Sequence, residues 1–427
     1  MRISVNLKQY LVITGNYWAF TLTDGALRML VVLFFHQLGY SPLEIAMLFI
    51  FYEFFGVVTN LVGGYLGARI GLNRTMQIGL VMQIIALAAL TVPTEYLTIL
   101  WVMAAQALSG IAKDLNKMSA KSAIKLLVPD NAQSTLYKWV AILTGSKNAL
   151  KGVGFFLGGL LLTLLGFVGA LYALMALLTV TWLLSLVLLQ GELGKAKAKP
   201  KFRQIFSKSR AINILSAARM FLFGARDVWF VIALPVVLSQ QFAWDHWQVG
   251  TFLAVWVIFY GFIQGIAPRL TGKDRSQRTA LGAEPNRSQR TALGAEPNRS
   301  QRTALDTEHG PSQHAVVLWA AGLTLIPLGI ALLLNAGIAP QLTIMIGLLL
   351  FALMFAVNSS LHSYLIIRFA DADGVSLDVG FYYMANAMGR LIGTVLSGLV
   401  FQTAGFVACL IISTLFLAAS TVIVRRL

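Results

Sequence analysis

The stretch FLFGARDVWFVIALPVVL, residues 221–238, places a cation and a carboxylate side by side within an apolar run. These two residues are Arg226 and Asp227. A charged side chain at the centre of a lipid bilayer costs about 2.5–3.5 kcal/mol on insertion scales, so such residues are candidates for binding substrate or carrying protons. If this run crosses a membrane, both residues are functional candidates.

Several other apolar runs also hold ionisable or polar side chains, spaced one helical turn apart. Such pairs are Asp24 with Arg28, Lys147 with Lys151, and Asn386 with Arg390; Tyr382 lies a further turn away, and Arg219 shares a helix face with Arg226. The predicted substrate ligands are Arg28, Lys147, Lys151, Arg226, Arg390, Asn386 and Tyr382, and the candidate proton-coupling or balancing carboxylates are Asp24, Asp227 and Glu53. The deep cations outnumber the deep carboxylates, which favours an anionic substrate with more than one anionic group.

A structural role is the alternative for some of these charges. Asp24–Arg28 and Arg226–Asp227 would then be neutralised pairs. A cytoplasmic gate is expected from Arg69, Lys113, Asp114 and Lys117. In the competing interpretation, Lys113, Lys117 and Lys121 are interfacial, because long cationic side chains extend to the membrane surface at helix ends. Lys147, Lys151 and Arg390 fit a structural role least well, because none has a carboxylate within one turn on its own helix.

The composition indicates that the surrounding solvent is lipid. The chain of 427 residues is 57% hydrophobic and only 12% charged, whereas soluble proteins carry about 25% charged residues. Apolar runs of about twenty residues, enough to cross a bilayer as a helix, recur throughout. The first run lacks a small-residue cleavage site, so we expect a retained helix rather than a signal peptide. The sequence predicts an all-α, multi-pass membrane protein.

The sequence predicts neither catalysis nor a bound metal or cofactor. It contains no Ser-His-Asp arrangement, no phosphate-binding glycine loop and no cluster of His or carboxylates at metal spacing. The single cysteine, Cys409, excludes a disulfide within the chain and a dithiol site for soft metals. A membrane-embedded enzyme or lipid-handling protein would need an acid, base or nucleophile cluster, and a membrane sensor would need a recognisable output domain. The sequence contains neither.

The net charge of +16 arises from basic residues gathered in alternate loops, such as 195–203 and 425–426. The intervening loops, such as VPTEY and NAGIAP, carry no Lys or Arg. This positive-inside pattern predicts that both termini are cytoplasmic. The basic loops are suited to contact with anionic lipid, and nucleic-acid binding has no support.

Hydropathy predicts about twelve spans in two six-helix halves, residues 1–190 and 211–427, joined by a basic cytoplasmic linker at 191–210. The predicted spans are 10–36, 42–66, 74–93, 97–118, 134–165, 168–190, 211–238, 244–268, 315–335, 339–368, 376–402 and 404–424. Between the eighth and ninth spans, the unit RSQRTALGAEPN is repeated. It has no helical or strand periodicity, so we expect a disordered loop at 272–314 with no role in transport.

The two halves resemble each other at their fifth spans. Residues 151–171, KGVGFFLGGLLLTLLGFVGAL, align without gaps on residues 390–410, RLIGTVLSGLVFQTAGFVACL. The alignment places Gly166 on Gly405 and Lys151 on Arg390. It predicts that Lys151 and Arg390 face one cavity from opposite sides as a cationic clamp for a bridging dianion. In the competing view, each is the structural partner of a buried carboxylate such as Asp24 or Asp227.

Parallel six-helix repeats are the plan of major facilitator transporters. The loop GYLGARIGLNR, residues 64–74, resembles that superfamily's signature, although Ala68 replaces its aspartate. Residues 112–159 and GARDVWFVIALPVVL, residues 224–238, closely resemble the organoarsenical efflux permeases, the ArsJ family. The resemblance implies a bacterial inner-membrane exporter of 1-arseno-3-phosphoglycerate that confers arsenate resistance. It also implies a functional link to the arsenate-using glyceraldehyde-3-phosphate dehydrogenase that makes this substrate.

We expect alternating access with proton antiport, and the leading alternative is an organophosphate or phosphate exchanger of the same superfamily. The arsenic of the implied substrate is pentavalent and bound to oxygen, so it requires no thiolate ligand. A cavity lined by several cations suits its two phosphate-like ends.

Overall fold

The computed structural model describes residues 5–40, 45, 48–129, 131–189, 191, 193–197, 208–244, 246–271, 311 and 313–427. The predicted repeat loop therefore lies almost wholly outside the described residues. The same holds for residues 192 and 198–207 of the predicted linker. The described part is helical throughout, without strands, as the sequence predicts.

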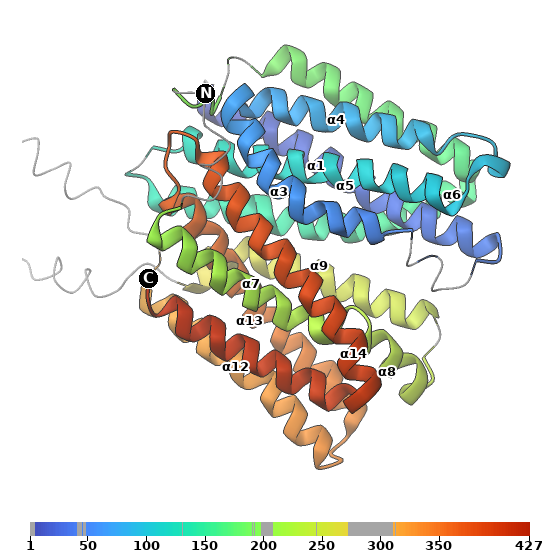
Figure 1. Cartoon of the computed structure of the whole chain (residues 1–427), viewed down its shortest axis with the longest axis vertical. Helices are drawn as coiled ribbons and strands as arrows, with labels where there is room; N and C mark the ends of the chain where they lie inside the picture. Colours follow the sequence, from blue (N-terminus) through green and yellow to red (C-terminus); the bar gives the residue numbers. More distant parts are fainter. Residues whose placement is uncertain are drawn as a thin grey trace, which may run out of the picture.

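The helices run antiparallel through the molecule (Figure 1). They are α1 (Val5–Gln37), α3 (Ile50–Ile70), α4 (Leu72–Ala89), α5 (Ile99–Leu127), α6 (Gln133–Leu188), α7 (Arg210–Phe230), α8 (Ala233–Phe242), α9 (His246–Thr271), α12 (Gln313–Asn335), α13 (Pro340–Phe369) and α14 (Val375–Val424), with a 3₁₀ turn at Thr94–Tyr96. Among the described residues, eight helical stretches are long and apolar enough to cross a membrane by length and composition. The fold agrees with the predicted twelve-helix architecture.

Two of the long helices are each bent by one glycine. Gly166 in α6 has φ 68° and ψ 179°, and Gly405 in α14 has φ 77° and ψ −174°. Positive φ favours glycine, and the same conformation at both positions divides each helix into two antiparallel spans. The structure therefore confirms the match of Gly166 to Gly405 in the internal alignment. With α7 and α8 joined as one span, the described helices provide twelve crossings.

The first part of α6 packs on α1, and the first part of α14 packs on α7. A Cβ added to Gly154 would lie 3.0 Å from the Cα of Gly25, and one added to Gly393 would lie 3.1 Å from the Cα of Gly224. Such close approach of helix backbones requires small residues. The two contacts relate the halves by internal symmetry and fix equivalent positions on α1 and α7.

The two halves meet most closely near the face that carries both chain termini, called here the termini face (Figure 1). There Gly64 of α3 packs against Gly380 of α14, and Ser376 Oγ donates a hydrogen bond of 2.8 Å to the Gly64 carbonyl. Lys125 Nζ donates to the Arg368 carbonyl at 3.2 Å, again between the halves. These contacts close the molecule at the termini face.

Candidate functional site

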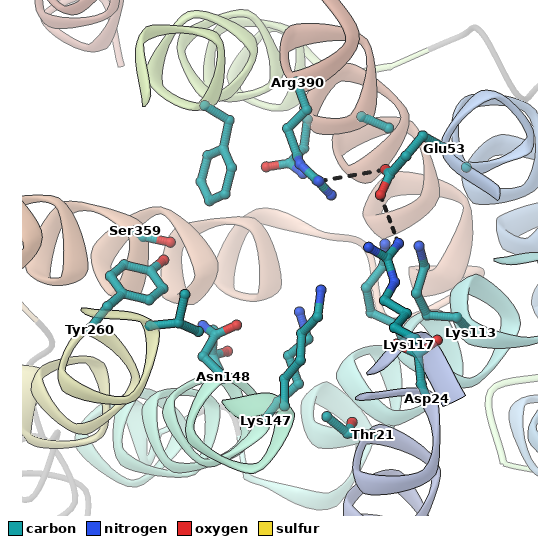
Figure 2. A pocket seen from close by; sticks show the side chains of 18 of the residues that line it. Thr21, Asp24, Glu53, Lys113, Lys117, Lys147, Asn148, Tyr260, Ser359 and Arg390 are labelled. Atoms are coloured by element: carbon teal, nitrogen blue, oxygen red, sulfur yellow. Dashed lines mark hydrogen bonds and ion pairs between the residues drawn. The ribbon is translucent and has the colours of Figure 1, made fainter. Parts of the chain in front are cut away.

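A cavity of about 460 Å³ lies between the two halves (Figure 2). Residues from α1, α3, α5, α6, α7, α9, α13 and α14 contribute to its lining. Nine cationic side chains line it: Arg28, Lys113, Lys117, Lys121, Lys147, Lys151, Arg219, Arg226 and Arg390. Three carboxylates also line it: Asp24, Glu53 and Asp114. The excess of cations predicted from the sequence is therefore concentrated in a single cavity.

One side of the cavity is a chain of alternating cations and carboxylates. Glu53 on α3 accepts from Arg28 Nη2 at 2.9 Å and lies 3.5 Å from Arg390 Nη2, which joins the two halves (Figure 2). Asp227, fully buried behind the cavity, binds Arg390 Nε at 3.1 Å and Arg226 Nη2 at 2.5 Å. We call Arg28, Glu53, Arg390, Asp227 and Arg226 the carboxylate-bridged wall.

The carboxylate-bridged wall bears on two expectations. Arg390 is not a free cation, because Asp227 from α7 and Glu53 from α3 both pair with it. Arg28 pairs with Glu53, whereas Asp24 accepts a hydrogen bond of 2.7 Å from the Tyr52 hydroxyl. Arg390 thus has the buried carboxylate partner of the competing view, and a cationic clamp with Lys151 stays a prediction. Asp24 and Arg28 do not form the neutralised pair that was the structural alternative. The Arg226–Asp227 pair is present.

Four lysines of the N-terminal half have no carboxylate partner among the described residues. Lys147 and Lys151 on α6 make no hydrogen bond or ion pair with any described residue, and Lys147 extends into the cavity (Figure 2). Lys113 Nζ lies 3.7 Å from the centre of the Tyr52 ring. Lys121 Nζ donates to Thr144 Oγ1 at 3.1 Å and to the Tyr383 hydroxyl. We call these four residues the lysine wall.

Three cations of the cavity lining lie on α5, and their positions disagree with the competing interpretation that they are interfacial. Lys113, Lys117 and Lys121 line the cavity, and Lys121 is only 4% exposed, so none is interfacial. The reason is helix length: α5 continues to Leu127, nine residues beyond the predicted end at residue 118. At 1.5 Å per residue, this extension moves these residues into the interior. Asp114, also on α5, binds Lys117 Nζ at 2.5 Å, so Lys117 does not belong to the lysine wall.

Arg69 alone among the expected gate residues lies at the termini face. Its side chain is exposed and its Nη1 donates to the Tyr65 hydroxyl at 2.7 Å. The loop beside it is held by the linker, because Ala196 N–H donates to the Ala68 carbonyl at 2.9 Å and Leu72 N–H donates to the Leu193 carbonyl at 2.7 Å. Gating by these residues stays a prediction.

Arg219 on α7 is a cavity residue that the predicted ligand set omits. Its side chain is 3% exposed, and its hydrogen-bond acceptors, on Asn386 and Ser359, are neutral. The sequence signal for it was its spacing of seven residues from Arg226, which places both arginines on the same face of the helix. Asn386 lines the cavity as expected, but Tyr382 is fully buried outside the lining and its neighbour Tyr383 lines the cavity instead.

Comparison with solved structures identifies the fold. The human organic anion transporter MFSD10 has a TM-score of 0.71 at 15% identity, over 98% of this chain and 99% of that one. A bacterial homologue of the iron transporter ferroportin in an outward-facing state has a TM-score of 0.71 at 11% identity, over 99% of both chains. The proton:xylose symporter XylE bound to 6-bromo-6-deoxy-D-glucose has a TM-score of 0.73 at 11% identity, over 99% of this chain and 95% of that one. At these identities the likeness concerns the fold alone.

The sequence comparison is more specific about the family. No curated protein matches the sequence significantly. Residues 13–284, more than half of the chain, match the family model of the Major Facilitator Superfamily. The chain therefore belongs to the Major Facilitator Superfamily, and it is a membrane transporter of this fold rather than an enzyme.

Proposed function

We propose that this transporter exports a polyanionic organoarsenical, 1-arseno-3-phosphoglycerate, from the cytosol of bacteria by alternating access. The observation that carries the proposal is the cavity lining, in which nine cations accompany three carboxylates. Desolvated cations without partners are costly, and an anionic substrate supplies the missing charge. Each charge-assisted contact to a phosphate-like oxygen contributes about 1.5–3 kcal/mol.

The position of sulfur supports an oxygen-bound rather than a thiol-bound form of arsenic. Cys409 is buried in the second part of α14 and does not line the cavity. Trivalent arsenic prefers thiolates, whereas an acyl arsenate offers oxygens to cations. The lysine wall and Arg219 therefore suit both the arsenate and the phosphate end of the proposed substrate.

Closure at the termini face supports a defined step of the transport cycle. If the termini are cytoplasmic, as the positive-inside pattern indicates, the cavity is closed to the cytosol by the contacts around Gly64 and Gly380. In an exporter this is the state after the substrate has been carried across. MFSD10, which has the same fold, is an organic anion transporter, and an anionic substrate of this chain is compatible with that likeness.

Proton antiport would drive export, with Asp24, Glu53 and Asp227 as the candidate carriers. Asp24 fits this role best, because its hydrogen-bond partner is the Tyr52 hydroxyl rather than an arginine. A protonophore added to everted vesicles should then stop substrate uptake. Undiminished uptake would exclude proton coupling and favour exchange against phosphate.

The substrate is tested by arsenic retention in cells with and without the transporter, each with and without the arsenate-using dehydrogenase. We expect the transporter to lower cellular arsenic and to protect against arsenate only in cells that contain the dehydrogenase. Equal protection without the dehydrogenase would contradict the organoarsenical substrate and the functional link to that enzyme.

An organophosphate or phosphate exchanger is the second candidate, because the same cations bind phosphate groups. The carboxylate-bridged wall leaves four lysines and Arg219 for a substrate of this kind. Reconstituted transport of 3-phosphoglycerate at the rate of its arseno derivative would favour the exchanger. A clear preference for the arseno derivative would favour the exporter.

A further inference from the structure

We propose that Arg219 is the centre of a second anion subsite, which binds one tetrahedral oxyanion group of the substrate in the C-terminal half. The inference rests on the proposed polyanionic substrate. It assigns one anionic end of that substrate to Arg219 and leaves the other end to Lys147 and Lys151. Phosphate and arsenate groups have the same shape and charge class, so the subsite accepts either.

The guanidinium of Arg219 is held through two of its three nitrogens. Its Nε donates to Asn386 Oδ1 at 3.0 Å, and its Nη1 donates to the carbonyl and Oγ of Ser359, each at 3.1 Å. No described residue accepts a hydrogen bond from Nη2. An arginine offers five N–H donors in a rigid plane, so the two N–H groups of Nη2 keep their capacity for a ligand.

Aromatic rings fix the plane of this guanidinium. Its central carbon lies 4.0 Å from the centre of the Phe223 ring and 5.3 Å from that of Tyr382. Stacking of this kind, together with the bonds to Asn386 and Ser359, orients the free donors before a ligand arrives. Tyr382, expected as a ligand, would then act by positioning Arg219.

The charge of Arg219 has no internal counterpart in the described part of the chain. The side chain is 3% exposed and forms no ion pair with a described carboxylate, in contrast to Arg28, Arg226 and Arg390. Arginine stays charged in proteins, so burial cannot be relieved by loss of a proton. A bound oxyanion is the partner that this position lacks.

A chain of neutral hydrogen bonds connects Arg219 with the lysine wall. Ser359 Oγ accepts from Gln264 Nε2 at 2.9 Å, and Gln264 Oε1 accepts from Asn148 Nδ2 at 2.6 Å. Asn148 follows Lys147 on α6, so the chain crosses from one half to the other. The two subsites therefore lie on opposite halves of one cavity, and a substrate with two anionic ends joins the halves as it binds.

The test is binding of two probes, inorganic phosphate and 3-phosphoglycerate, to the purified full-length protein, measured by calorimetry. We expect the wild type to bind 3-phosphoglycerate at least tenfold more tightly than inorganic phosphate. Arg219→Gln should remove most of this advantage and change phosphate binding less than about threefold. Arg219→Lys should behave like the glutamine variant, because lysine lacks the planar fork.

A second variant avoids the removal of a buried side chain. Asn386→Asp places a carboxylate beside Arg219 and fills the subsite from within the protein. We expect a folded protein in which the advantage of 3-phosphoglycerate is lost, whereas Arg425→Gln, at an exposed position outside the cavity, should keep it. Retention of the advantage in Arg219→Gln or Asn386→Asp would overturn the subsite. Equal loss of both probes would overturn it as well, since Arg219 would then be structural.

The outcome is separable from that of the proposed function. If 3-phosphoglycerate binding depends on Arg219 but arsenic retention is independent of the dehydrogenase, the subsite stands and the organoarsenical substrate is wrong. If retention behaves as proposed and the variants bind both probes as the wild type does, the exporter stands and the subsite is wrong.

Discussion

The carboxylate-bridged wall and the lysine wall line the same cavity but treat their cations in opposite ways. In the first, two carboxylates hold three arginines at 2.5–3.5 Å. In the second, four lysines have aromatic or hydroxyl neighbours, or no close partner among the described residues. The contrast indicates different roles for similar charges. The paired arginines have a structural role between the two halves, and the unpaired lysines are available to bind an anionic substrate.

Internal symmetry explains how the contrast arises. Lys151 and Arg390 occupy equivalent positions, and Arg28 follows Gly25 at the spacing at which Asp227 follows Gly224. In one half the neighbouring helix therefore offers Lys151 a cation, and in the other it offers Arg390 a carboxylate. This difference between the repeats gives Arg390 a carboxylate partner on the neighbouring helix, whereas Lys151 forms no ion pair with a described residue.

The largest effect is expected from breaking the carboxylate-bridged wall at its buried member. Asp227→Asn leaves Arg226 without its partner and Arg390 with only Glu53, and such a loss costs about 3–5 kcal/mol. We expect a marked fall in the thermal unfolding temperature of the detergent-purified protein. The double variant Asp227→Asn with Arg226→Gln should recover part of it; an unchanged temperature in the single variant would show that the wall does not stabilise the fold.

Breaking the lysine wall should reduce transport instead of stability. Lys147→Gln and Lys151→Gln each remove one contact to the substrate, so we expect uptake to fall roughly ten- to a hundredfold. The thermal unfolding temperature should stay the same or rise, because an unpaired buried charge is removed. Lys138→Gln, at an exposed position on the same helix, is the matched control and should transport normally. Normal transport in both lysine variants would refute their role as ligands.

A smaller effect is expected from neutralising Glu53, the carboxylate that lies between the two halves. Glu53 competes with an anionic substrate for Arg28 and Arg390. Glu53→Gln should therefore raise the affinity for 3-phosphoglycerate about three- to tenfold, a gain of about 1 kcal/mol. Weaker binding in this variant would mean that Glu53 shapes the site rather than competes with the ligand.

The smallest effect concerns the only thiol of the chain, Cys409. It is buried away from the cavity, so Cys409→Ala removes one sulfur from the packing and no proposed ligand. Arsenate resistance should be unchanged at equal expression. A clear loss of resistance would favour thiol-bound trivalent arsenic as the substrate.

The sequence is informative where the signal lies within one helix. Hydropathy predicts the spans, the internal alignment matches Gly166 to Gly405, and the cation excess predicts the charge of the cavity. The pairing of Arg390 with Asp227 was only the competing view, because its carboxylates come from two other helices and turn spacing reports only partners on the same helix. The depth of Lys121 was missed because polar cavity residues lower the hydropathy of α5 before the helix ends.

Transport into everted vesicles tests the central claim, that the lysine wall carries a polyanionic organoarsenical. Vesicles would be incubated with arsenate, glyceraldehyde 3-phosphate, NAD and the arsenate-using dehydrogenase, and vesicular arsenic would then be measured. We predict that arsenic accumulates only with the complete enzyme mixture, and falls to background in the Lys147→Gln, Lys151→Gln double variant while Lys138→Gln accumulates it normally. Equal accumulation of arsenic without the dehydrogenase, or in the double variant, would contradict the account.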